Sequence, residues 1–404
     1  MGDIYERAYI TIAATWASNC NDGLFSPEKD KYEARKMWTS NLYVRERPPR
    51  FPLTLQQRLS TDESSLTFWP LLRRAWVYQE RLLSRRIVHF GKRQVHWECR
   101  SAFLQEDGTF YEEPNSYNNL GTAVMSFKTF PKATKNAWRK TVTEYTQLDL
   151  TYKSDRLPAI AAVAERNMRL RTGDIYVAGM WLNWENSLLD ELAWYTDWWY
   201  TDQKHPNERN YARSTASIPT WSWASISTAI FWLNNNWSED VETLPTPRLL
   251  DMGFTLNGPA HVGKVKDAYI SISGPSLAAT LLFTPIAQAV GYYETRVVVE
   301  DSPYSKDLRL AYIPDLPLKQ EERTVMCTQE VIVVLLTRSR RPSPRRSGIV
   351  LREVSNGQYE RVGYMSIRHE SSRSEYATGD VSQTSEEYLD GFVASLPIRE
   401  VTIT

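Results

Sequence analysis

The chain has 404 residues, and 42% of them are hydrophobic, so it can form two or three domains with sizeable apolar cores. Lys plus Arg and Asp plus Glu number 48 each, and this zero net charge argues against a protein that binds nucleic acid or an anionic membrane by bulk charge. Three widely spaced cysteines and the lack of a long uninterrupted apolar run predict a cytoplasmic protein with reduced thiols and no membrane span.

The first predicted elements are the end of a helix over residues 3–9 and a buried strand over residues 9–15. A buried strand needs hydrogen-bonding neighbours on both sides, and no residues upstream of this strand supply them. We therefore expect the chain to begin inside a domain whose opening strands are missing. Residues 27–70 are polar and interrupted by prolines, which is typical of a peripheral insertion, with one strand at 42–44.

The most informative stretch of the sequence is residues 74–84. Its apolar side chains recur at the three- to four-residue spacing of a helix with one buried face. Residues 87–90 and 94–99 then alternate apolar and polar side chains on either side of Gly91, which predicts a β-hairpin. Most of the functional interpretation depends on this helix and hairpin.

Glu80 and two histidines are the first candidates for chemistry. Glu80 follows Trp76 by one helical turn, so its carboxylate could have a raised pKa suited to acid–base catalysis. The alternative, which we favour, is that Glu80 pairs with an arginine and fixes the helix against the hairpin. His89 and His96 lie on the two arms of the hairpin and could bind a metal, but a catalytic zinc needs three protein ligands, so we expect ordinary strand residues.

Three further groups have both a functional and a structural interpretation. Cys99 could be a nucleophile activated by His96, but residues three apart in a strand point to opposite faces, so we expect a buried structural thiol. Five arginines within residues 338–346 could bind an acidic partner, but no aromatic residues are interleaved with them, and we expect a solvated hairpin loop. Trp221 and Trp223 could be a ligand platform, but their alternation on one strand face favours the core.

The remaining chain is first helical and then rich in strands. The apolar spacing predicts helices at 138–145, 157–168 and 184–194. Short segments rich in Val and Ile predict strands at 268–273, 296–300, 331–337, 348–354 and 359–367. We therefore expect a mixed α+β protein with one region at 1–105, a helical connector at 106–215 and a β-rich region at 216–404, in which the polar segment 370–387 is mobile.

The common catalytic and ligand-binding signatures are missing from this sequence. There is no glycine-rich nucleotide motif, no H-E-x-x-H, no G-x-S-x-G and no zinc-ligand spacing. We therefore assign no catalytic residue, no metal ligand and no cofactor.

Four stretches, in this order, resemble the fungal heterokaryon-incompatibility (HET) domain and the region that follows it. They are residues 4–8 with 11–15, residues 74–84 with 88–90 and 97–99, residues 138–145 with 150–159, and residues 219–225. The family's two opening strand motifs are absent, so the resemblance covers only the latter part of the HET domain. The motif positions, for which we expect packing rather than catalytic roles, are Arg74, Ala75, Trp76, Gln79, Glu80, Arg81, Leu82, Leu83, Trp97, Glu98, Cys99, Trp221 and Trp223.

The resemblance implies a fold and a role. HET domains are thought to share a distant architecture with TIR domains, so residues 1–105 would be a partial TIR-like α/β remnant. The implied role is fungal non-self recognition, a programmed cell death signal that acts through self-association or other incompatibility factors, and we expect this chain alone to be inactive. The TIR relationship also implies an alternative, an NAD-consuming hydrolase that uses Glu80, which rests on fold analogy alone.

Overall fold

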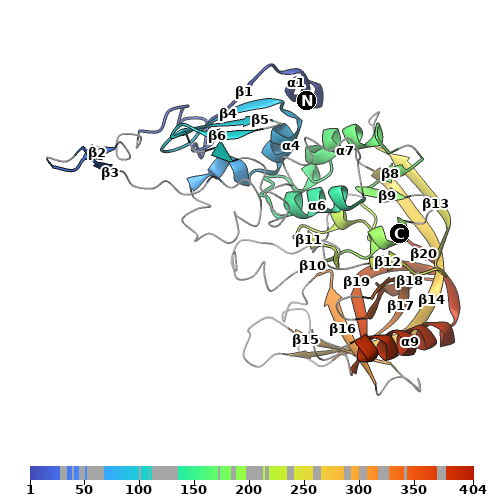
Figure 1. The fold of residues 1–404 in the computed structure, drawn as a ribbon. Coiled ribbons are helices and arrows are strands. Elements are labelled where there is room, and N and C mark those ends of the chain that lie inside the picture. The colour runs from blue at the N-terminus through green and yellow to red at the C-terminus, as the bar shows by residue number, and fades with distance from the viewer. Residues whose placement is uncertain are drawn as a thin grey trace. The chain divides into compact units, whose positions relative to one another are not determined.

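The computed structural model has a mixed α+β fold in which strands predominate toward the C-terminus, as predicted (Figure 1). The chain forms two compact units, Met1–Leu170 and Arg171–Thr404, and their boundary falls within the predicted connector at 106–215. The structure describes residues 1–27, 34–38, 41–44, 51, 68–99, 102–108, 110–111, 135–171, 173–182, 188–196, 213, 218–233, 241–257, 265–285, 293–299, 307–316, 327–340, 344–370 and 379–404.

The first unit contains a five-stranded sheet in the order β1-β4-β5-β6-β7. Its strands are β1 (Thr11–Ala13), β4 (Arg86–Phe90), β5 (Val95–Cys99), β6 (Phe103–Gln105) and β7 (Phe110–Tyr111), and β2 (Arg35–Lys36) pairs separately with β3 (Tyr43–Val44). Strand β1 runs parallel to β4, and the other neighbours are antiparallel. The predicted hairpin is therefore confirmed, and it places His89 directly opposite His96.

Strand β1 lies at one end of this sheet. Among the described residues its strand partner is β4 alone, and Ile12 in its middle is 61% exposed. The prediction of a buried strand with neighbours on both sides is therefore wrong for the described part of the chain. An apolar run marks a strand, but it does not distinguish a central strand from an end strand with an open outer edge.

Helix α4 (Ala75–Leu83) is the central helix of the first unit. It contacts α1 (Gly2–Arg7), η2 (Pro70–Arg73), α6 (Lys135–Thr146), η4 (Pro158–Ile160) and α7 (Ala161–Met168). The short helix η3 (Lys153–Asp155) contacts η4. The helix begins after Arg74 and ends before Ser84, two residues with extended backbones, so its bounds agree with the prediction. Ala75, Leu82 and Leu83 are buried, as expected of packing positions.

The second unit is built on a nine-stranded sheet in which one long strand has two sets of partners. The strands are β12 (Val241–Thr243), β13 (Arg248–Leu256), β14 (Val265–Pro285), β15 (Tyr293–Val298), β16 (Leu308–Pro314), β17 (Cys327–Ser339), β18 (Arg345–Ser355), β19 (Gln358–His369) and β20 (Ile398–Ile403). Strand β14 pairs with β20 through residues 270–275 and with β17 through residues 276–283. Because β17, β18, β19 and β20 pair in turn, β14 closes a ring of five strands.

Short elements precede this sheet in the second unit. They are β8 (Ile175–Val177), β9 (Met180–Leu182), η5 (Leu188–Leu192), β10 (Tyr195–Thr196), η6 (Trp223–Ser225) and β11 (Ile230–Phe231). Two predictions are corrected here. The helix expected at 184–194 is a short 3-10 helix at its described positions, while residues 183–187 lie outside the described part of the chain. The segment 221–225 is a turn followed by a 3-10 helix, not a strand.

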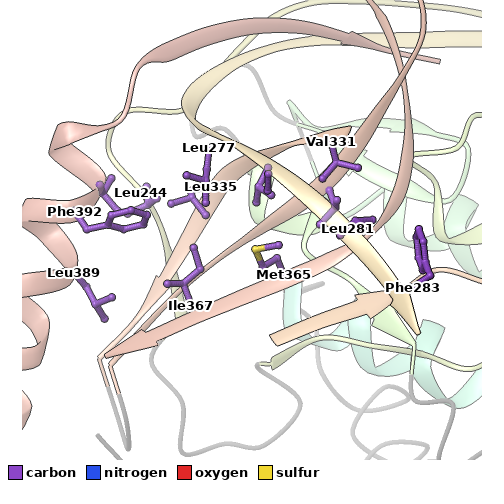
Figure 2. Packing of buried hydrophobic residues seen from close by; sticks show 14 residues of the cluster. Leu244, Leu277, Leu281, Phe283, Val331, Leu335, Met365, Ile367, Leu389 and Phe392 are labelled. Atoms are coloured by element: carbon purple, nitrogen blue, oxygen red, sulfur yellow. The ribbon is translucent and has the colours of Figure 1, made fainter. Parts of the chain in front are cut away.

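The core of the second unit lies between the ring of strands and helix α9 (Gly379–Ser395). Figure 2 shows Leu389 and Phe392 pointing from α9 toward the strands, where Leu335 and Ile367 are also buried. The polar segment 370–387 was expected to be mobile, but from Gly379 onward it is the first half of this helix. The apolar residues that anchor the helix follow that segment, so its own composition does not reveal them.

Arg338, Arg345 and Arg346 do not lie in a solvated loop, contrary to the prediction, whereas Arg340 is 52% exposed and Arg341 lies outside the described residues. Strands β17 and β18 extend through Arg338, Arg345 and Arg346, and the side chain of Arg346 is fully buried. Its Nη2 lies 2.6 Å from Asp390 Oδ1 and 3.2 Å from Glu386 Oε1, both on α9. The cationic residue therefore attaches the helix to the sheet.

Replacing Phe392 with Ala should lower the free energy of unfolding of the second unit by about 3–5 kcal/mol, because the ring is completely buried and its removal leaves a cavity. The matched control is Phe254→Ala in the same unit, where the side chain is 40% exposed and the loss should be about 1 kcal/mol. Chemical denaturation of both variants measures the difference. Equal losses would contradict the placement of α9 over the core.

Candidate functional site

The polar side chains of α4 hold the first unit together. Three of them bind the segments that follow later in the chain: Trp76 Nε1 donates to Asp155 Oδ2 at 3.1 Å, Tyr78 Oη donates to Glu144 Oε2 at 2.9 Å, and Gln79 Oε1 accepts from the backbone N–H of Ala162 at 2.7 Å. The last of these satisfies a free N–H in the first turn of α7. The polar side chains at 76, 78 and 79 of this helix thus each have a structural explanation.

A buried hydrogen-bonded chain connects α4 to the hairpin and to the end of β1. Arg81 Nε donates to Glu98 Oε2 at 2.7 Å, and His89 Nε2 lies 3.0 Å from the same oxygen. Because an ionised carboxylate only accepts hydrogen bonds, Nε2 of His89 carries the proton. His89 Nδ1 lies 3.0 Å from Thr15 Oγ1, and all four side chains are buried.

Glu80 is not the residue that fixes the helix against the hairpin, which is the role predicted for it. That role belongs to the next residue, Arg81, through Glu98. The Glu80 side chain is half-buried and hydrogen-bonds to Tyr5 of α1; burial raises the pKa of its carboxyl, while Tyr5 and Arg74 oppose the rise. Burial and the Glu80 carboxylate raise the pKa of Tyr5 to about 12.

His96 lies in an aromatic environment on the buried face of the hairpin. Its ring is 4.8 Å from that of Phe51 and 5.3 Å from that of Trp69. Burial, with His89 close by, lowers the pKa of His96 to about 3, so the imidazole is neutral at physiological pH. In the described part of the chain, no cluster of three His, Cys, Asp or Glu residues could hold a metal ion.

The other motif positions of the first unit lie away from this buried chain. Trp97 and Cys99 are on the opposite face of β5 and are half-buried, so the expectation of a buried thiol is wrong. Arg74 is exposed just before α4. Sequence reasoning missed Thr15 and the pairing of Glu98, although the two-residue period of a strand already places Glu98 on the same face as His96.

Trp221 and Trp223 are completely buried in the second unit, as predicted, but they pack from a turn and not from a strand. Trp223 Nε1 donates to the carbonyl of Gly179 at 2.8 Å, and Ser222 Oγ donates to that of Ala178 at 2.5 Å. Ala178 and Gly179 form the turn between β8 and β9 with positive φ angles of 50° and 89°. The hydrogen bonds from Ser222 and Trp223 thus stabilise a turn with positive φ angles, a backbone conformation that ordinarily favours glycine.

A buried arginine in strand β19 is the electrostatic centre of the second unit. The Arg361 guanidinium lies 3.3 Å from the centroid of the Trp194 ring, and its Nε is 3.2 Å from Asp315 Oδ2. It also donates to the carbonyls of Leu192 and Trp194, both at 2.5 Å. Burial lowers the pKa of Arg361 to about 10, and Asp315 opposes this effect.

The hydrogen-bonded carboxylates of the two networks, Glu98 and Asp315, are both buried. Glu98 does not reach solvent, and its Oε2 is shared by two donors, so it is poorly placed to take a proton from a substrate. Of the two carboxylates in the motif, Glu80 is partly exposed and Glu98 is buried. No helix within the described residues is both long and apolar enough to cross a membrane.

The chain has no match among protein-family models, curated proteins or solved structures.

Replacing Glu98 with Gln should lower the free energy of unfolding by about 3 kcal/mol or more, because the charge of Arg81 would stay buried without its anionic partner. The control is Asp149→Asn, which removes the partner of Arg73 in a pair whose side chains are 34% and 50% exposed. That change should cost less than about 1 kcal/mol. Urea denaturation at neutral pH distinguishes the two, and a Glu98 variant as stable as the control would refute the pairing.

Acid should destabilise the first unit through His96. Its pKa is about 3 in the folded chain and near the ordinary 6.5 when unfolded, so the unfolded state binds the proton first as pH falls through this interval. Stability therefore decreases with falling pH, and between pH 6.5 and 5 this one group contributes about 1.5 kcal/mol of the loss. In His96→Phe that part of the loss should disappear. Phe103→Leu, an apolar change beside His96, should keep the wild-type pH dependence.

Proposed function

We propose that this chain is a HET-domain protein of fungal non-self recognition and that it acts in cell death signalling through protein interaction. The supporting sequence feature is the ordered resemblance of the four stretches described above. The supporting structural feature is that most of the polar motif side chains of α4 make contacts within the first unit. A motif whose side chains bind within the unit fits a scaffold that presents a surface to partner proteins. Such a role does not require a substrate pocket.

The observation that carries the interaction proposal is an exposed apolar edge at the N-terminal end of the first unit. Ile4 of α1 is 70% exposed, Tyr9 is 79% exposed and Ile12 of β1 is 61% exposed. Among the described residues β1 pairs only with β4, so the outer backbone groups of β1 are available to an added strand. A second copy of the chain is the partner we infer, because identical end strands pair antiparallel about a two-fold axis.

The alternative activity is an NAD-consuming hydrolase in which Glu80 is the carboxylate. One observation favours it: Glu80 is partly exposed and has a pKa raised by burial. Purified protein incubated with NAD would then release nicotinamide, and Glu80→Gln would abolish the release. Absence of turnover in the wild-type protein would remove this alternative.

The edge proposal predicts that Ile12→Lys lowers self-association at least tenfold. A lysine on an end strand disfavours edge-to-edge pairing, because its charge would be buried in the contact. Sedimentation equilibrium and co-precipitation of two differently tagged copies measure the effect. Val354→Lys in the second unit, at a position 63% exposed, is the matched control and should associate like the wild type.

The link to non-self recognition needs a cellular readout. The wild-type chain expressed alone in a fungal host should not cause the growth arrest that a full-length relative causes, as expected above for this chain by itself. Growth arrest equal to that of the full-length relative would contradict this expectation.

A further inference from the structure

The ring of Phe51 fills an aromatic enclosure in the first unit. Phe51 is 3% exposed, and four rings surround it with centroids 4.8–4.9 Å away, those of Trp69, His89, His96 and Phe103. The guanidinium of Arg81 lies 5.3 Å from its centroid. The enclosure is therefore the size of one planar six-membered ring.

Polar groups around this ring have no partner, which is unusual for a core. Within the part of the chain that the structure describes, Arg81 Nη1 and Nη2, Trp69 Nε1 and both ring nitrogens of His96 are buried without a hydrogen bond. Buried donors in folded proteins are nearly always bonded, and a cluster that is not calls for an explanation. The hydrocarbon ring of Phe51 cannot accept conventional hydrogen bonds from any of these groups.

The charge distribution favours an anion. Arg81 uses only Nε to bind Glu98, and the oxygen that it binds is shared with His89. The two Nη atoms thus form a free fork, which matches the two oxygens of a carboxylate. Trp69 Nε1 is a further buried donor without a hydrogen bond, on a ring whose centroid lies 4.8 Å from that of Phe51.

We propose that the Phe51 enclosure is a binding site for a planar aromatic ring that carries a carboxylate, and that the Phe51 side chain occupies the position of the ligand ring. The ligand ring would stack among the surrounding rings, and its carboxylate would accept hydrogen bonds from Arg81 and Trp69. This inference is independent of the interaction edge at β1.

The test removes the internal ring and supplies a free one. Phe51→Ala should bind benzoate at least tenfold more tightly than toluene, measured by calorimetry and by the rise in melting temperature. Acetate, which has the carboxylate without the ring, should not bind at millimolar concentration. If toluene binds as tightly as benzoate, or if benzoate does not bind, the enclosure is only an apolar core and the proposal fails. If the alanine variant is unfolded without ligand, benzoate but not toluene should restore its folded signal by circular dichroism.

A donor deletion tests the orientation of the site. Adding Trp69→Phe to the Phe51 variant keeps a ring at this position but removes Nε1, so benzoate should bind at least fivefold more weakly while toluene is unaffected. The control is Trp16→Phe, because Trp16 Nε1 donates to the carbonyl of Leu24 at 2.9 Å and lies outside the enclosure. Unchanged benzoate affinity after Trp69→Phe would overturn the assigned contact.

Discussion

The buried carboxylate of Glu98 is the constraint on which the first unit depends. A charged group so far from solvent is tolerated only when partners satisfy it, and its partners come from different elements: Arg81 from α4 and His89 from β4. Contacts of 2.7 and 3.0 Å fix the distance between the helix and the hairpin. The order of the sequence, with a helix followed directly by two strands, brings all three groups to one place with short loops.

The second unit uses the same principle with a buried cation. Arg361 is satisfied by Asp315, by carbonyls at the end of η5 and by the face of Trp194. The tryptophan segment joins the same region, because Trp194 Nε1 donates to the carbonyl of Trp221 at 2.9 Å. In both units, therefore, a motif that appears chemically active in sequence serves to satisfy buried polar groups.

Local patterns predicted local structure well. The helix at α4, the hairpin after it and parts of five strands of the second unit follow from apolar periodicity, whereas β12, β13, β16 and β20 were not predicted. The sequence alone does not show which of two adjacent residues, Glu80 or Arg81, faces the hairpin. The packed helix shows that Arg81 faces Glu98. The two sets of partners of β14 and the exposure of β1 likewise depend on contacts between residues distant in the chain.

The buried polar groups of the first unit fall into two classes, and the difference between them bears on function. Glu98, His89 and Arg81 Nε are bonded to one another, so packing and folding explain them. The Nη atoms of Arg81 and the Trp69 indole nitrogen are buried without protein partners in the described structure, and folding alone would be served as well by apolar side chains. Arg81 belongs to both classes. Because the bonded chain from Thr15 through His89 and Glu98 ends at Arg81, it joins the open end of the sheet at β1 to the enclosure around Phe51.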